Sequence, residues 1–167
     1  MNHLATSKED ILAASRDLIK ENGWAAVSIR AVASRCSVSA GTIYNYYESK
    51  ADLLSDTIES IWHEIFFHPE DEQIFHDVES CISWIYERLE YGNRQFPGFF
   101  SLHSFGFMRD EKTSGKKRMM KTWGHILNGL CEVLENDPKV RADVFDQEFT
   151  EKKFADILFS LILVSMI

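Results

Sequence analysis

The segment CSVSAGTIYNYYESKADLL, residues 36–54, decides the fold class and contains three tyrosines within four residues. Core tyrosines in a helix recur at helical spacing, so Tyr44, Tyr46 and Tyr47 cannot all face one core. Ile43 and Tyr47 are four residues apart and therefore share one face of a helix. The segment predicts that Tyr47 packs inward and that Tyr44 and Tyr46 point outward.

The residues before and after this segment complete a helical motif. Ser28 is a favourable N-cap for a short helix, because its hydroxyl can accept an early backbone N–H. Residues 37–39 read as a turn, and a further short helix is predicted over residues 40–46. Two short helices joined by a tight turn indicate a helix-turn-helix over residues 28–47.

Capping boxes predict where two longer helices begin. Thr6 and Glu9 have the capping-box spacing, so the first helix is expected to begin near Thr6 or Ser7. Ser49 and Asp52 repeat that spacing and open a long fourth helix. Gly and Pro positions predict two helix ends, the first helix at Asn22-Gly23 and the seventh before Asp137-Pro138. Hydrophobic spacing predicts a fifth helix through Val78 and Leu89, a short sixth helix within residues 97–108 and a loop over residues 109–117. It also predicts an eighth helix from about Thr150, whose inward residues are Phe154, Ile157, Leu158, Leu161 and Ile162.

The elements predict an all-α protein with a three-helix head over residues 1–50 and a helical bundle over residues 51–167. The length of 167 residues suggests one domain or a small module joined to a larger one, and 45% hydrophobic residues suffice for a core. The net charge is −8. Residues 1–55 hold six basic and six acidic side chains, so the whole excess lies in the rest of the chain.

The composition favours a cytoplasmic protein. The N-terminus lacks the basic-then-apolar pattern of a signal peptide, and the apolar run over residues 154–167 is shorter than the ~20 residues that span a bilayer. No membrane partner is therefore expected. Cys36, Cys81 and Cys131 form no CxxC pair, which favours separate thiols over disulfides or a thiolate zinc site.

The second short helix of the motif has a surface that suits DNA. Ala40 and Gly41 are small, so the helix N-terminus could approach a phosphate backbone closely. Thr42, Tyr44 and Asn45 offer hydrogen-bonding groups, and Tyr46 does the same one residue later. The helix carries no acidic residue.

The run SIRAVASRCSVSAGTIYNYYESKADLL resembles the DNA-binding segment of the TetR (tetracycline-repressor) family of transcriptional regulators. The resemblance covers about residues 8–60 and includes Val-Ser-x-Gly-Thr-x-Tyr and Ser-Lys-x-x-Leu in register. It implies a DNA-binding head, a helical ligand-binding and dimerisation bundle, and no enzymatic activity or cofactor. It places DNA-contacting residues at Ser28, Arg30, Ala40, Gly41, Thr42, Tyr44, Asn45, Tyr46 and Lys50.

Two positions depart from the family pattern. Ser37 replaces the usual turn glycine, and serine tolerates a left-handed backbone less well. Asn45 lies where histidine or a larger residue is common, and its amide could pair with adenine. The operator sequence therefore cannot be taken from relatives.

The resemblance also implies partners: a palindromic double-stranded DNA operator, a small-molecule effector and a second copy of the chain. The family forms its homodimer through its last two helices, of which one is visible, so we expect the chain to continue beyond residue 167. We expect a repressor that an apolar or aromatic effector releases from DNA.

The bundle is rich in aromatic side chains. They could line an effector pocket or simply fill the core, and both interpretations stay open. The pocket hypothesis names Trp62, Phe66, Trp84, Phe100, His103, Trp123 and Leu127.

Other motifs favour structural roles. His63 and His68 nearly match a zinc motif, but five residues place them about 140° apart on a helix, so no metal site is predicted. His103 and His125 could bond a ligand, although structural roles are favoured, and the basic residues 116–121 suit a solvated helix start. No phosphate-binding loop or nucleophile motif occurs, so no catalytic residue is assigned. Two alternatives remain: a small-molecule carrier or enzyme with a vestigial head, and a protein-docking role for the tyrosine surface.

Overall fold

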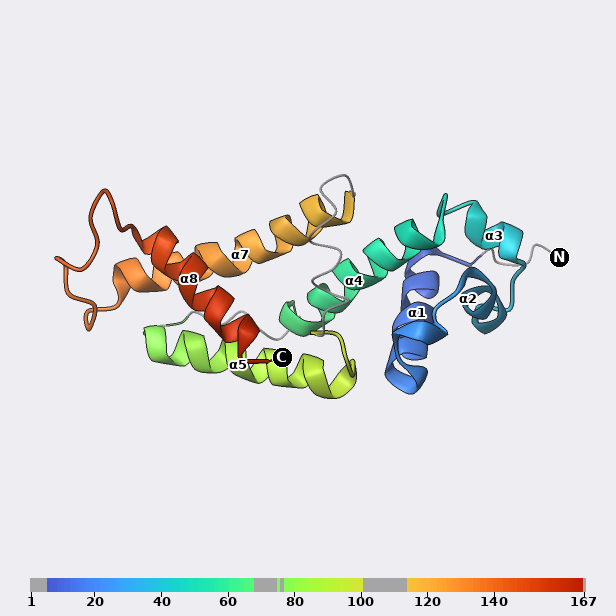
Figure 1. Cartoon of the computed structure of the whole chain (residues 1–167), viewed down its shortest axis with the longest axis horizontal. Helices are drawn as coiled ribbons and strands as arrows, with labels where there is room; N and C mark the ends of the chain where they lie inside the picture. Colours follow the sequence, from blue (N-terminus) through green and yellow to red (C-terminus); the bar gives the residue numbers. More distant parts are fainter. Residues whose placement is uncertain (1–5, 68–74, 76, 101–113, 167) are drawn as a thin grey trace.

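The computed structural model describes residues 6–67, 75, 77–100 and 114–166 of the chain. The predicted all-α fold is confirmed for these residues. Figure 1 shows a head at one end of an elongated molecule and a helical bundle at the other, with one long helix leading from the first to the second. The elements are α1 (Lys8–Asn22), η1 (Trp24–Ala26), α2 (Ile29–Arg35), α3 (Ala40–Tyr44), α4 (Lys50–Phe66), α5 (Val78–Gln95), α7 (Ser114–Asn136) and α8 (Glu151–Val164).

Side-chain caps fix the helix starts in the head. Ser28, Ser39 and Ser49 each accept a hydrogen bond from the backbone N–H three residues later, which confirms the caps predicted at Ser28 and Ser49. Gly23 ends α1 with φ 75°, in agreement with the predicted stop. Each cap satisfies a backbone donor that has no partner within its helix.

The predicted start of α1 near Thr6 or Ser7 is confirmed, but the predicted capping-box pair was wrong by one residue. The reciprocal capping box joins Ser7 and Asp10, at 3.1 Å and 2.8 Å, rather than Thr6 and Glu9. Both pairs have the required spacing, but Thr6 is buried beside the head core and its carbonyl accepts a hydrogen bond from Tyr46 Oη. Tertiary contact at Thr6 therefore decides between two registers that the sequence leaves equal.

The head core forms where α1, α2 and α3 meet. Its side chains include Ile43 and Tyr47, which the helical spacing predicted to share one inward face. The fully or almost fully buried members are Ile11, Leu18, Ile19, Val27, Ile29, Val32, Ala33, Ile43 and Tyr47. Burial of these apolar groups holds the short helices α2 and α3, which are too short to be stable alone.

In the bundle, α4 packs against α5 and α7, and α8 packs against α7. Figure 1 shows α5, α7 and α8 grouped away from the head, with α4 between. Helix α7 ends before Asp137-Pro138, and Thr150 caps α8, both as predicted. Among the described residues, no helix is both long and apolar enough to cross a membrane.

Two predictions for the bundle were wrong. Residues 114–117 belong to α7, although they were assigned to a loop, because Ser-Gly at a helix start is tolerated in the first turn. Ile157 and Leu161 were expected inside but are 50% and 63% exposed. Helix α8 is apolar on nearly every face, so its spacing allows more than one inward stripe, and Ala155, Phe159, Ile162 and Leu163 are the buried residues. The predicted sixth helix lies mostly outside the described residues.

A glycine permits the close approach of α5 to α4. A Cβ at Gly92 would lie 2.5 Å from Ile65 Cδ1 and 3.3 Å from Phe100 Cζ, and both side chains are buried. Gly92→Ala is expected to lower the free energy of unfolding by about 1–3 kcal/mol, because the core must move to accept the methyl group. Urea unfolding monitored by circular dichroism would measure this.

Gly124 provides the matched control for that substitution. It lies within α7, and no atom comes within 4 Å of a Cβ added there. Gly124→Ala should raise the free energy of unfolding by about 0.5–1 kcal/mol through helix propensity. If both variants were equally stable, close packing at Gly92 would not be what limits that position.

Candidate nucleic-acid interface

The turn between α2 and α3 is closed by two backbone hydrogen bonds. Val38 N–H donates to Ala33 O at 2.9 Å, and Ser37 N–H donates to Ser34 O at 3.1 Å. This is the Schellman arrangement, which requires a left-handed residue directly after the helix cap. Ser37 takes that position with φ 56°, where glycine is usual in the family pattern. The turn therefore has the left-handed backbone that glycine usually provides, and the Cβ of Ser37 makes this conformation slightly less favourable.

Ser37→Gly is expected to raise the free energy of unfolding by about 0.5–1 kcal/mol, because glycine reaches positive φ without a Cβ clash. Ser34→Gly is the control, since Ser34 lies within α2 and glycine there should lower stability by a similar amount. Thermal and urea unfolding of the two variants would measure the difference. Equal destabilisation by both would show that Ser37 carries no strain.

The three tyrosines divide as predicted. Tyr47 is 4% exposed and packs in the head core, whereas Tyr44 and Tyr46 are 56% and 40% exposed. Tyr46 Oη donates a hydrogen bond to Thr6 O, so this ring is tied to the start of α1. Within the described residues, Tyr44 Oη has no hydrogen-bond partner, and neither has the exposed amide of Asn45. Among the residues that the structure describes, Tyr44 and Asn45 therefore supply unpartnered polar groups at the end of α3.

The start of α3 is accessible and internally bonded. Gly41 is exposed, and a Cβ there would meet only Ser39 Oγ at 3.5 Å. Thr42 Oγ1 and Ser39 Oγ lie 3.0 Å apart, and Thr42 N–H donates to Ser39 Oγ. Ala40 is half-buried beside them. A flat phosphate backbone could approach this end of α3 without meeting a large side chain.

Four of the six basic side chains in residues 1–55 are ion-paired, and the other two have no ion-pair partner among the described residues. The ion pairs within the chain join Lys8 to Asp56, Arg16 to Glu9 and Glu64, Lys20 to Glu64, and Arg35 to Glu21. Arg30 and Lys50 are exposed and have no ion-pair partner among the described residues. Arg30 follows the Ser28 cap, and Lys50 opens α4, so these charges flank α3 on both sides along the chain.

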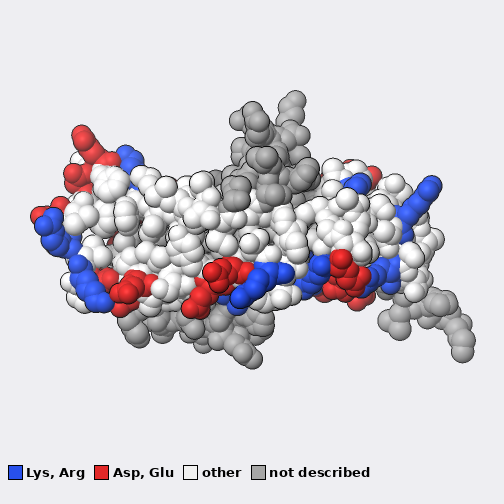
Figure 2. All heavy atoms as spheres, turned by 60° about the horizontal axis from the view of Figure 1, so that its bottom comes forward, with Lys and Arg blue, Asp and Glu red and all other residues white. Residues whose placement is uncertain are grey.

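The paired charges are visible as well. Figure 2 shows acidic and basic side chains in contact along one edge of the molecule and basic side chains projecting at the head end. Hydrogen bonds from Arg35 lower the pKa of Glu21 below its ordinary value. Pairing of this kind removes Arg35 from the set of free cations, although it lies on the same helix as Arg30.

The aromatic residues named for a pocket mostly pack on one another. The Trp62 ring lies 5.8 Å from Phe66, 5.7 Å from Phe100 and 5.6 Å from Trp123, centroid to centroid. All four side chains are at most 9% exposed. These contacts therefore agree with the interpretation that the rings fill the core. The buried indole N–H groups of Trp62 and Trp123 have no hydrogen-bond acceptor in the described structure.

A small cavity of about 140 Å³ lies beside this cluster. It brings two of the predicted pocket residues, Phe66 and Trp84, together with His125. Leu127 is half-buried nearby in the sequence but does not line the cavity, and His103 lies outside the described residues. The lining residues that the sequence did not single out are Phe67, Phe75, Cys81, Ile85, Ile126, Gly129 and Leu130.

The histidines and cysteines provide no metal centre in the described part of the chain, where no group of three possible ligands occurs. His63 stacks on Phe67 at 5.0 Å, and His68 lies outside the described residues. Burial raises the pKa of Cys81 to about 11, so this side chain is a neutral thiol near pH 7. The side chains of residues 116–121 lie outside the described part of the chain, so their solvent exposure stays a prediction.

Comparison with known proteins agrees with the geometry of the head. Residues 11–57 match the family described as bacterial regulatory proteins, tetR family. The head of this chain therefore matches the TetR family. The transcriptional regulator UidR of Escherichia coli K12 is 38% identical over 48 residues, and the transcriptional repressor KstR of Rhodococcus jostii RHA1 is 45% identical over 47 residues. These matches span 29% and 28% of this chain but only 24% and 22% of the relatives.

Solved structures extend the likeness from the head to the bundle. A TetR regulator from Haloarcula marismortui superposes with a TM-score of 0.71 at 19% identity, covering 95% of this chain and 83% of that one. Bacillus subtilis FadR in complex with stearoyl-CoA gives 0.65 at 20% identity, covering 96% and 85%. At these identities the likeness shows a shared fold.

Proposed function

We propose that the protein is a cytoplasmic, effector-responsive transcriptional regulator, most simply a repressor. The observation that carries this proposal is a pair of exposed cations, Arg30 and Lys50, which have no ion-pair partner in the described part of the chain and flank the acid-free helix α3. Helix α3 enters the major groove of an operator, and a second copy reads the other half-site. The relatives UidR and KstR are a transcriptional regulator and a transcriptional repressor, which supports the same role here.

Each residue of the head has a proposed task. Arg30 and Lys50 bind phosphates, and the small residues Ala40 and Gly41 let the start of α3 approach the backbone. Tyr44 and Asn45 contact base edges, since their polar groups are unpartnered within the described structure. The remaining contacts are positional and come from Ser28, Thr42 and Tyr46.

Self-association is proposed through α8. Ile157, Leu161 and Val164 are 50%, 63% and 65% exposed, and they recur at helical spacing along one side of α8. Such a stripe of large apolar side chains marks a surface that a partner helix covers. A homodimer built on this surface presents two heads to a palindromic operator.

The effector is proposed to act through α4, the helix that leads from the head to the aromatic cluster (Figure 1). Phe66 and Trp84 line the small cavity beside that cluster, and the buried N–H of Trp62 lies in the cluster itself. FadR of Bacillus subtilis, which has the same fold, was solved with stearoyl-CoA, whose acyl chain is apolar. We therefore propose an effector with a large apolar part here. A coupling of roughly 1–3 kcal/mol between effector and DNA would suffice for regulation.

Glu64 provides a contact through which α4 can move the head. Its carboxylate lies 3.1 Å from Arg16 Nε and 2.7 Å from Lys20 Nζ, both on α1. Arg88 of α5 donates to the carbonyls of Glu64 and Ile65 at the same level of the helix. A shift of α4 relative to α5 would therefore be passed through Glu64 to α1, the first helix of the head.

Selection of bound sites from random duplex DNA, at two salt concentrations, tests the proposed function. We expect an enriched palindrome whose binding weakens steeply with salt, because phosphate contacts release counterions. A folded, dimeric protein that enriches no sequence would overturn the proposal. In that case a carrier role for the bundle would be tested next.

A further inference from the structure

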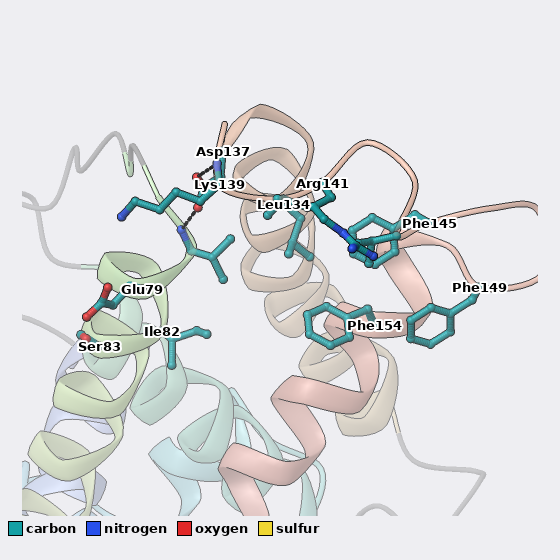
Figure 3. Close-up of a pocket in the computed structure, with 13 residues that line it drawn as sticks. Glu79, Ile82, Ser83, Leu134, Asp137, Lys139, Arg141, Phe145, Phe149 and Phe154 are labelled. Atoms are coloured by element: carbon teal, nitrogen blue, oxygen red, sulfur yellow. Dashed lines mark hydrogen bonds between the residues drawn. The ribbon is translucent and has the colours of Figure 1, made fainter.

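A cavity of about 640 Å³ lies at the end of the bundle remote from the head. It opens to the surface and is lined by the start of α5, the end of α7, the connection over residues 137–149 and the start of α8 (Figure 3). Its wall is almost entirely apolar and includes Val78, Ile82, Leu134, Val140, Phe145 and Phe154. Pockets of about 300–1,000 Å³ with this kind of lining are typical of small-molecule sites.

The connection that covers the cavity is held by its own hydrogen bonds. Asp146 Oδ1 accepts from Glu148 N–H at 2.8 Å and from Phe149 N–H at 2.7 Å. Lys153 Nζ donates to Glu148 O at 2.6 Å and so ties the connection to α8. The rings of Phe145, Phe149 and Phe154 contact one another at 5.8–6.1 Å. These contacts fix the shape of the connection along this side of the cavity.

A buried carboxylate fixes the opposite wall. Asp137 is 6% exposed and accepts hydrogen bonds from Val78 N–H and Lys139 N–H, both at 2.8 Å. It therefore joins the start of α5 to the end of α7, as the dashed lines of Figure 3 show. Lys139 Nζ also lies 3.1 Å from Asp77 Oδ2, which caps α5.

The charges around the cavity determine what kind of ligand fits. Lys139 is paired with Asp77, and Arg141 Nε lies 3.3 Å from Asp143 Oδ1, so each cation of the lining already has a carboxylate beside it. Glu79 adds an exposed carboxylate to the lining, which disfavours an anionic ligand further. Asp137 and Lys139 of the wall already have hydrogen-bond or ion-pair partners, and most of the remaining wall is apolar, so it favours burial of apolar ligand area.

We propose that this cavity is a second ligand site, separate from the aromatic cluster, and that it takes an uncharged apolar molecule of about two fused or linked rings. Phe154 lines the cavity from α8, the helix that also carries Ile157 and Leu161 on its outer face. A ligand here therefore acts on the position of α8. This regulatory effect rests on the proposed function, whereas binding itself does not.

Titration with N-phenylnaphthylamine, an uncharged aromatic fluorophore that brightens in apolar sites, tests the proposal. We expect the full chain to bind it, and Ser83→Trp to weaken that binding at least tenfold, because Ser83 is exposed and lines the cavity. Val144→Asp should weaken it similarly by placing a charge on the lining without filling the space. Ser34→Trp, an exposed position on α2 away from the cavity, should leave binding unchanged.

The variants distinguish binding in this cavity from binding elsewhere on the protein. Unchanged binding in both cavity variants would place the fluorophore at another site, such as the aromatic cluster, and would overturn the proposal. Absence of binding by the folded chain would also overturn it, since an apolar cavity of this size should take up the fluorophore. Operator binding measured in parallel reports on the proposed function independently, and Ser83→Trp should retain it.

Discussion

Replacing Arg30, Tyr44 and Lys50 together by alanine is expected to lower the affinity for operator DNA on the order of 1,000-fold. Arg30 and Lys50 are the exposed cations of the head that have no ion-pair partner among the described residues. A dimer would lose four phosphate contacts and two tyrosine contacts. The slope of log affinity against log salt should therefore become shallower by about four, while the fold stays intact.

Arg35→Ala is the matched control for this triple variant. Arg35 lies on the same helix as Arg30 and carries the same charge, but it is bonded to Glu21 and lies 4.0 Å from Asp17. Its loss should change the salt slope little. Fluorescence anisotropy with the selected operator would measure both variants. Normal binding by the triple variant would refute the assignment of these three residues, even if the protein binds DNA by another surface.

The head was predictable because its decisive signals are local. Ser28, Ser39 and Ser49 each cap the next helix through a hydrogen bond that spans three residues. The inward position of Tyr47 follows from its spacing to Ile43, and the observed burial of both confirms it. Signals of this range are fully contained in a short piece of sequence.

The errors occurred where the sequence offers two equal choices. At the start of α1, Thr6 and Ser7 can each begin a capping box, and a contact from Tyr46, forty residues away, decides between them. Along α8, apolar residues cover most faces, so periodicity does not identify the buried one. In both cases tertiary packing supplies the information that local patterns lack.

Which charges of the head are free also depends on tertiary contacts that local patterns do not reveal. The count of six basic and six acidic residues in residues 1–55 suggested a neutral surface. Glu64, outside that range, neutralises Arg16 and Lys20, and Asp56 neutralises Lys8. Which cations remain free depends on contacts between α1 and α4, and no local spacing rule predicts these contacts. The cavity of about 640 Å³ was not predicted for a similar reason, because its wall combines residues that are far apart in the sequence, such as Val78 on α5 and Phe154 on α8.

Introducing charge on the outer face of α8 is expected to separate the proposed dimer into monomers. Ile157 and Leu161 are exposed in the single chain, so glutamate at both positions should not disturb the core of a protomer. In a dimer the same positions would be buried, and two carboxylates per chain without partners would oppose association strongly. Analytical ultracentrifugation should show a monomer at concentrations where the unmodified chain is a dimer.

DNA binding should fall together with the dimer. A monomer reads one half-site, so operator affinity should drop by a factor of about 100 or more as the advantage of joined half-sites is lost. Lys152→Glu is the control, because it introduces the same residue in the first turn of α8, where an acidic group suits the helix dipole. If the Ile157→Glu, Leu161→Glu variant stayed dimeric while folded, α8 would not form the interface. If instead it became monomeric yet bound the operator normally, a single head would suffice for recognition, and the palindrome expected from site selection would have to arise from two independent binding events.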